Sequence, residues 1–131
     1  MSAKILIIDD DTDDVDILSE AFKSSGVESV HYVHTAMQAF IYLEGIKSKE
    51  DLPKLIVTDQ YLPGMTGVEF MTDLKKMIDY KDIPVIVLST IKSVKEIEKY
   101  RQLGMVDYLV KPSTYAEYVQ VADFIKSKVS V

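Results

Sequence analysis

Length, composition and charge limit what this chain can be. Its 131 residues suit one domain with a single core, and 47% hydrophobic with 27% charged residues gives no sign of disorder. A net charge of -6 disfavours direct nucleic-acid binding, and the lack of cysteine excludes disulfides and thiolate metal sites. Because no apolar stretch could span a bilayer and the start of the chain lacks a secretory signal pattern, we expect one cytoplasmic domain over residues 1–131, with no output domain attached and no membrane contact.

The predicted strands are short apolar runs spaced along the chain. They cover residues 5–8, 30–34, 55–58, 85–88 and 108–110. Four of these runs are almost entirely apolar, which is typical of strands buried on both faces of a parallel sheet. The second run is more polar, so we expect it at the edge of the sheet.

Helix signals alternate with these strands. Thr12 is expected to cap the first helix, which Gly26 ends, and the second helix covers residues 36 to about 46. A loop follows at residues 62–67, and Ile78 continues the helical spacing of the third helix. Capping-box pairs precede the last three helices, namely Thr66 with Glu69, Ser93 with Glu96, and Thr114 with Glu117. The alternation predicts an α/β fold of five parallel strands and five helices with right-handed crossovers.

Polar residues follow four of the predicted strands. They are Asp9, Asp10 and Asp11 after the first strand, Asp59 after the third, Ser89 and Thr90 after the fourth, and Lys111 with Pro112 after the fifth. In parallel sheets, ligands bind outside the carboxyl ends of the strands. We therefore expect carboxylates, a hydroxyl and an ammonium to converge on one edge.

These segments together resemble the receiver domain of bacterial two-component response regulators, along essentially the whole chain. The matching segments are residues 7–10, 57–59 with 62–67 downstream, 87–90 and 108–112. The resemblance implies a single-domain regulator of the chemotaxis type, with a flavodoxin-like three-layer (βα)5 sandwich and strand order 2-1-3-4-5.

The resemblance also implies a role for individual residues. Asp59 would accept a phosphoryl group from a sensor histidine kinase or phosphotransfer protein, as an aspartyl phosphate. Asp9, Asp10, Asp59 and the backbone carbonyl of Tyr61 would hold Mg²⁺, which prefers hard oxygen ligands. Lys111 would bind a phosphoryl oxygen. The chain would then be a signalling domain that catalyses only its own phosphorylation and dephosphorylation.

A conformational switch is implied by the same resemblance. Ser89 would bond to the phosphoryl group, and Tyr108 would turn inward on the face formed by the fourth helix, fifth strand and fifth helix. A downstream protein would dock on that face, which could also form a homodimer. The Lys111–Pro112 peptide bond would be cis, as in the family.

Four positions depart from the family pattern. Tyr61 and Ile91 are bulky and lie two residues after Asp59 and Ser89, so we predict slow loss of phosphate. Thr90 is larger than the alanine or glycine often found there, and Ser113 stands where many members have an aromatic residue.

Other readings of the acidic residues remain open. A receiver-like interaction module that is not phosphorylated is kept open by Tyr61, Thr90 and Ser113. A haloacid-dehalogenase-type phosphatase would use Asp9-Asp10-Asp11, but Asp13 stands where that pattern needs Thr or Val, and Asp59 would have no role. A calcium loop starting at Asp9 fails because Asp14 stands where the turn needs glycine.

The other polar residues have simpler expectations. Asp11, Asp13 and Asp14 are expected to be solvated charges at a helix start, and His31 and His34 to be structural or exposed.

Overall fold

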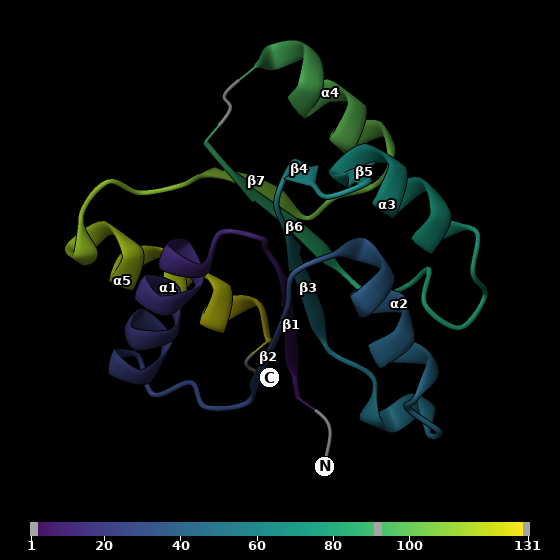
Figure 1. The fold of residues 1–131 in the computed structure, drawn as a ribbon, viewed down its shortest axis with the longest axis horizontal. Helices are drawn as coiled ribbons and strands as arrows, with labels where there is room; N and C mark the ends of the chain where they lie inside the picture. The colour runs from purple at the N-terminus through teal and green to yellow at the C-terminus, as the bar shows by residue number, and fades with distance from the viewer. Residues whose placement is uncertain (1–2, 91–92, 130–131) are drawn as a thin grey trace.

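The structure, a computed structural model, describes residues 3–90 and 93–129. Strands and helices alternate along the chain (Figure 1). The strands of the main sheet and a small hairpin are β1 (Ile5–Ile8), β2 (Val30–Val33), β3 (Leu55–Thr58), β4 (Tyr61–Leu62), β5 (Met65–Thr66), β6 (Val85–Ser89) and β7 (Asp107–Val110). The helices are α1 (Thr12–Ser24), α2 (Ala36–Glu44), the 3-10 turn η1 (Lys49–Asp51), α3 (Gly67–Lys75), α4 (Val94–Gln102) and α5 (Tyr115–Val129).

The main sheet has five parallel strands in the order β2-β1-β3-β6-β7. Since β6 and β7 are its fourth and fifth strands along the chain, this is the predicted order 2-1-3-4-5. The register pairs Ile8 with Thr58, and Val87 with Tyr108. Neighbouring strands therefore end at the same edge of the sheet, as the positions of the polar residues predicted.

Helices cover both faces of this sheet and form two hydrophobic cores. Helices α1 and α5 lie on one face, and α2, α3 and α4 lie on the other (Figure 1). Along β1, Ile5 and Ile7 pack toward the first group of helices, while Leu6 and Ile8 pack toward the second. This alternation explains why the strand is apolar at every position, since successive side chains point to opposite, equally buried faces.

The first helix begins differently from the prediction. Asp11, not Thr12, is the N-cap residue, and its Oδ1 accepts hydrogen bonds from the backbone N–H groups of Asp13 and Asp14 at 3.0 and 3.1 Å. Thr12 is the first helical residue. A carboxylate satisfies two backbone donors and carries a negative charge at the positive end of the helix, so aspartate is well suited to this position.

The third helix is shorter than predicted. It ends at Lys75, and the N–H groups of Lys76 and Met77 bond to carbonyls three residues back, which tightens the last turn. Leu74 is the last core residue of this helix, and Ile78 lies beyond it with 78% of its surface exposed. The expected loop before the helix contains the β4–β5 hairpin, whose turn is made by Gly64 at a φ of 78°.

The three predicted capping boxes differ in how many of their hydrogen bonds are present. Thr66 and Glu69 make both reciprocal hydrogen bonds. Thr114 Oγ1 accepts from the N–H of Glu117 at 3.2 Å. At Ser93 only the bond from the N–H of Glu96 is present, because the Glu96 carboxylate accepts instead from Gln60 and Lys99.

No helix in the described ranges combines the length and apolarity needed to cross a membrane.

Candidate functional site

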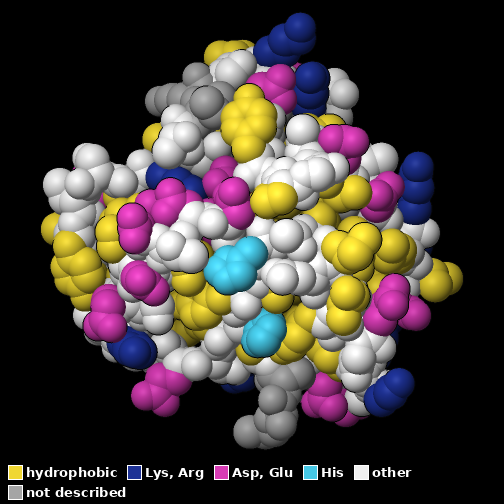
Figure 2. All heavy atoms as spheres, in the orientation of Figure 1, with side chains coloured by type: hydrophobic (Ala, Val, Ile, Leu, Met, Phe, Trp, Pro, Cys, Tyr) yellow, Lys and Arg dark blue, Asp and Glu magenta, His cyan; other side chains and the backbone are white. Residues whose placement is uncertain are grey.

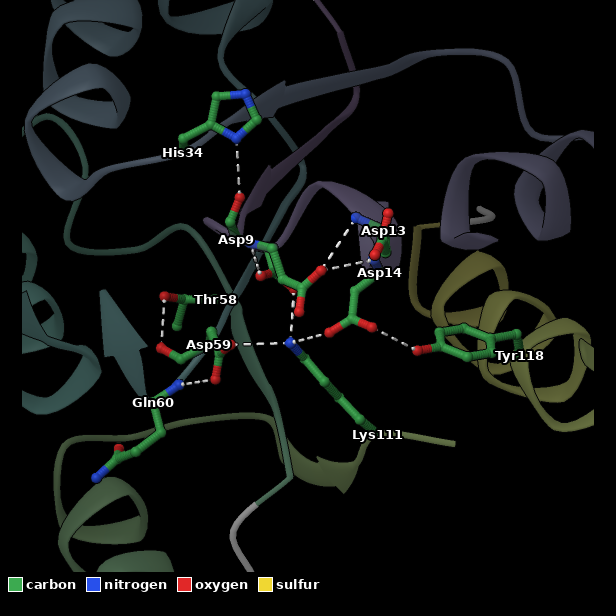
Figure 3. Close-up of polar contacts among 10 residues, drawn as sticks. Asp9, Asp13, Asp14, His34, Thr58, Asp59, Gln60, Lys111 and Tyr118 are labelled. Atoms are coloured by element: carbon green, nitrogen blue, oxygen red, sulfur yellow. Dashed lines mark hydrogen bonds and ion pairs between the residues drawn. The ribbon is translucent and has the colours of Figure 1, made fainter. Parts of the chain in front are cut away.

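Three strands bring their terminal side chains together at one edge of the sheet. Asp9 follows β1, Asp59 follows β3 and Lys111 follows β7 (Figure 3). The Lys111 Nζ lies 2.8 Å from Asp9 Oδ2 and 2.9 Å from Asp59 Oδ2. The convergence expected from the strand ends is therefore present for both carboxylates and the ammonium.

A third carboxylate contacts the same ammonium. Asp14, in the first turn of α1, places its Oδ2 2.8 Å from Lys111 Nζ. Sequence reasoning missed this contact by treating Asp14 as a solvated charge. A signal was available, because Asp14 lies four residues before the buried Leu18 and so shares the inward face of the helix.

Burial strengthens the electrostatics of this cluster. The side chains of Lys111 and Asp9 are only 6% and 7% exposed. Burial by itself lowers the pKa of Lys111, but hydrogen bonds to Asp14, Asp9 and Asp59 outweigh it and raise this pKa, so the ammonium stays charged. Burial raises the pKa of Asp9, with Lys111 acting in the opposite direction. Negative charge predominates here, and Figure 2 shows acidic side chains gathered on the surface near the start of α1.

The acidic residues fit a divalent cation. Asp9, Asp10 and Asp59 can each offer a carboxylate oxygen, and these oxygens lie within 4.8 Å of one another. Asp9 is buried and Asp10 is exposed, so the group opens to solvent on one side. A compact set of hard oxygen donors with excess negative charge is the environment that Mg²⁺ prefers.

Backbone donors hold the remaining carboxylate oxygens in place. The N–H of Asp11 donates to Asp9 Oδ1 at 2.9 Å, and the N–H of Gln60 donates to Asp59 Oδ1 at 2.6 Å. The His34 ring Nδ1 lies 3.1 Å from the Asp9 carbonyl oxygen, which gives this histidine a structural contact (Figure 3). Asp59 is therefore oriented by Gln60 on one oxygen and by Lys111 on the other.

Gln60 also links the site to α4, a contact that sequence reasoning missed. Its side chain is 3% exposed, and its Nε2 donates to Glu96 Oε2 at 2.9 Å. The residue after Asp59 thus contacts one helix that borders the expected docking face. No periodic signal marks this pairing, since Gln60 lies in a turn between two strands.

Ser89 and Tyr108 form a second pair. Ser89 is fully buried at the end of β6, and the Tyr108 hydroxyl is hydrogen-bonded to it. Burial raises the pKa of Tyr108, and the bond to Ser89 opposes that shift. The Tyr108 ring packs against Tyr100 with 5.8 Å between centroids. Both residues predicted to switch thus contact each other in this structure.

One predicted feature of the site is wrong. The Lys111–Pro112 peptide bond is trans, not cis. The trans form is favoured intrinsically by about 0.5–1 kcal/mol. Lys111 reaches its three carboxylates in this form, and its backbone N–H donates to the Ser89 carbonyl at 2.9 Å, so these contacts do not require the cis bond.

The remaining departures from the family pattern lie at the surface or outside the described part of the chain. The Tyr61 side chain is 58% exposed, and Thr90 and Ser113 are also exposed. Ile91 lies outside the described residues.

Tyr118 gives the cluster a measurable dependence on alkaline pH. Its hydroxyl donates to Asp14 Oδ1 at 3.3 Å, and burial followed by the charge of Asp14 raises its pKa to about 12 from 10.0. Between these values the unfolded chain loses a proton that the folded chain keeps, so the free energy of unfolding falls as pH rises. Tyr118→Phe should make this fall shallower by up to about 1.4 kcal/mol per pH unit, measured by urea unfolding over that interval. Equal slopes for the two proteins would contradict the raised pKa.

Comparison with known proteins identifies the family. The profile of the response regulator receiver domain matches residues 5–123. The chain belongs to the response regulator receiver domain family. It is therefore a phosphoacceptor response regulator of two-component signalling, which interacts with histidine kinase or phosphotransfer partners. Receiver domains are signalling domains, and this disfavours the phosphatase reading of the acidic run.

Individual receiver-domain relatives differ in length. The chain is 31% identical over 124 residues to the two-component response regulator ORR13 of Oryza sativa subsp. japonica, covering 95% of this chain and 98% of that protein. It is 37% identical over 119 residues to the transcriptional regulatory protein PrrA of Mycobacterium tuberculosis, covering 90% of this chain but 47% of that protein. The chain thus spans nearly the whole of one relative and about half of the other.

Solved receiver structures have the same fold. The phosphorylated cyanobacterial phytochrome response regulator RcpA matches with a TM-score of 0.82 and 28% identity, covering 97% of this chain and 93% of that one. The Mn²⁺-bound form of response regulator Rcp1 matches with a TM-score of 0.79 and 26% identity, covering 94% and 91%. The Rcp1 structure holds Mn²⁺, and in this chain Asp9, Asp10 and Asp59 form a compact acidic group that could hold a divalent cation.

Proposed function

We propose that Asp59 is the phosphoacceptor of this receiver domain. The observation that carries the proposal is the position of its carboxylate, which contacts the Lys111 ammonium and forms one acidic group with Asp9 and Asp10 at the carboxyl edge of the sheet. Asp59 is 12% exposed at its side chain, so it is reachable yet shielded from bulk water.

The proposed reaction is a phosphoryl transfer from a phosphohistidine of the partner. An Asp59 carboxylate oxygen forms a bond to phosphorus, the phosphorus–nitrogen bond breaks, and the histidine leaves with the electron pair. Lys111 binds an oxygen of the transferring group as a fixed positive charge. The N–H of Gln60 holds the Asp59 carboxylate in a constant orientation during the transfer.

Mg²⁺ is the proposed cofactor. Asp9, Asp10, Asp59 and the backbone carbonyl of Tyr61 would hold it. A bound divalent cation offsets the repulsion between the acidic residues and the phosphodonor and stabilises charge on the transferring phosphoryl oxygens. The chain contributes Asp9 and Asp10, together with an Asp59 carboxylate that is already oriented by its hydrogen bonds.

Mg²⁺ should stabilise the folded domain. Binding to the folded state alone at one hundred times the dissociation constant raises the free energy of unfolding by about 2.7 kcal/mol. Thermal unfolding with and without Mg²⁺ should show this as a higher Tm in the wild type. Asp10→Asn should lose most of the increase, because one of the three carboxylates in the group becomes neutral. An undiminished increase in this variant would place the cation elsewhere.

The proposed output is protein docking on the face formed by α4, β7 and α5. Exposed apolar side chains lie along it, with Val94 86%, Val106 45% and Val110 43% exposed. A phosphoryl group adds about -1.5 to -2 charges beside Lys111. Ser89 would bond to it and exchange its contact with Tyr108, which alters this face. The downstream protein, or a second copy of the chain, would bind by its preference for the altered face.

Slow loss of phosphate remains a prediction. Tyr61 begins β4 directly after the Asp59–Gln60 turn, and a bulky side chain there shields the phosphoryl group from attacking water. Tyr61→Asn, alone and with Ile91→Glu, should shorten the lifetime of the aspartyl phosphate. The measurement is decay of the phosphorylated mass after the phosphodonor is removed. A lifetime unchanged in both variants would refute the role of these residues.

Direct labelling tests the proposed function. The protein is incubated with acetyl phosphate, with Mg²⁺ or with a chelator, and its intact mass is measured. One phosphoryl group should be added only with Mg²⁺, and peptide mapping should locate it at Asp59. A protein that stays unlabelled in Mg²⁺, or that carries the phosphoryl group on another residue, would refute the assignment of Asp59 as the acceptor.

A further inference from the structure

The Lys111 ammonium has as many carboxylate partners as it has donors. An ammonium has three N–H groups, and the three partners are Asp9, Asp14 and Asp59, at 2.8, 2.8 and 2.9 Å. The group rotates only about the bond that joins it to the side chain. Two fixed hydrogen bonds therefore determine the direction of the third N–H group. The bonds to Asp9 and Asp14 direct that group toward Asp59.

Asp14 is itself held from two directions. Its Oδ1 accepts from the Tyr118 hydroxyl of α5 at 3.3 Å, while its Oδ2 faces Lys111 (Figure 3). Its backbone N–H donates to the Oδ1 of Asp11, the cap of α1. The side chain is 25% exposed, so much of it is packed between the two helices. A carboxylate anchored in this way can orient a partner.

We propose that Asp14 is a positioning residue for phosphoryl transfer, which fixes the Lys111 ammonium toward the acceptor, and that Tyr118 orients Asp14. The inference rests on the proposed role of Asp59. When a phosphoryl oxygen replaces the Asp59 oxygen as the third partner, the bonds to Asp9 and Asp14 can persist. Lys111 then meets the transferring group without reorientation, which is how positioning lowers a barrier.

Negative charge at the start of α1 does not by itself explain why Asp14 contacts Lys111. Asp13 carries the same charge in the same turn, but it is exposed. Asp14 shares its helix face with Leu18, which is 2% exposed. The two residues therefore provide a matched comparison, because Asp13→Ala and Asp14→Ala alter net charge equally and differ in contact with Lys111.

The test compares rates of phosphoryl transfer from acetyl phosphate across a range of Mg²⁺ concentrations, followed by intact mass. Asp14→Ala should lower the maximal rate by about tenfold, because a misdirected ammonium is a positioning defect. Asp14→Asn should lose less, since its amide oxygen still accepts from Lys111. The half-saturating Mg²⁺ concentration should stay within about twofold of the wild type, because the proposed ligands are other residues. Asp13→Ala should keep the wild-type rate.

A second measurement reports orientation directly. An ammonium held by three acceptors exchanges its protons slowly enough to give a nitrogen-15 NMR signal, whereas a rotating, solvated one does not. The Lys111 signal should be present in the wild type and in Asp13→Ala and absent in Asp14→Ala. A purely structural role for Asp14 would lower stability and leave the signal of the folded fraction in place.

Failure of this inference can be told apart from failure of the proposed function. A wild type that is not labelled at Asp59 would overturn the proposed function. Normal labelling of the wild type, with an unchanged maximal rate in Asp14→Ala or an equal loss in Asp13→Ala, would overturn the positioning role alone. If Asp14→Ala does not fold, Asp14→Asn and Tyr118→Phe decide instead. Slower transfer in both supports the role, and wild-type rates in both refute it.

Discussion

Asp59→Asn should abolish phosphorylation by acetyl phosphate. The amide that replaces the carboxylate is a poor nucleophile and cannot form the acyl phosphate, although it has nearly the same shape. Its one amide oxygen can accept from Lys111 or from the N–H of Gln60, which use different oxygens of Asp59, and because the shape is kept the fold should be retained. The intact mass should show no added phosphoryl group after an incubation that labels the wild type completely.

Asp123→Asn is the matched control for this substitution. Asp123 is exposed on α5, and the change in shape and charge is identical. It should be labelled at the wild-type rate. If Asp59→Asn is still labelled at another carboxylate, for instance Asp9, Asp59 is not the phosphoacceptor. That result would favour the phosphatase interpretation of Asp9-Asp10-Asp11.

Lys111→Met should destabilise the domain and slow its phosphorylation. The substitution leaves buried Asp9 and partly buried Asp14 and Asp59 without the ammonium that neutralises them. Removing one partner of a buried ion pair costs about 3–5 kcal/mol, so we expect a loss of about 3 kcal/mol in buffer without Mg²⁺. Loss of the charge that binds a phosphoryl oxygen should lower the transfer rate by about 10²-fold. Urea unfolding and intact-mass kinetics measure the two effects.

Mg²⁺ and a surface lysine provide the controls for this variant. Saturating Mg²⁺ should recover part of the lost stability, because it also neutralises Asp9 and Asp59. Lys23→Met should change the free energy of unfolding by less than about 0.5 kcal/mol, since its contact with Glu20 is 3.7 Å long and both side chains are 67% exposed. Equal stability of the wild type and Lys111→Met without Mg²⁺ would mean that water already solvates the three carboxylates, so that the ammonium adds no stability.

The fold and three site residues could be predicted from the sequence because their signals are local. An apolar run such as residues 55–58 predicts a buried strand, and the residue that follows it must lie at the carboxyl edge of a parallel sheet. Asp9, Asp59 and Lys111 all occupy such positions, and the structure brings them within hydrogen-bonding distance. The resemblance to receiver domains added the roles that those positions suggest.

Some predictions were wrong, and one contact was not predicted at all. The bond before Pro112 is trans where the family resemblance implied cis, and α3 ends at Lys75, before Ile78. The contact between Gln60 and Glu96 joins a turn to a helix that no pattern relates to it.

The order of strands and helices, the two buried layers and the charged residues at the strand ends could all be predicted from the sequence, because each depends on the period of nearby side chains. The spacing to Leu18 places Asp14 on the inward face of its helix, but the contact of Asp14 with Lys111 emerges only from the tertiary structure. This contact joins residues 97 positions apart, and the contact of Asp14 with Tyr118 joins α1 to α5. Such pairs form only after helices pack on the sheet, because packing sets the distance and direction between side chains on separate elements.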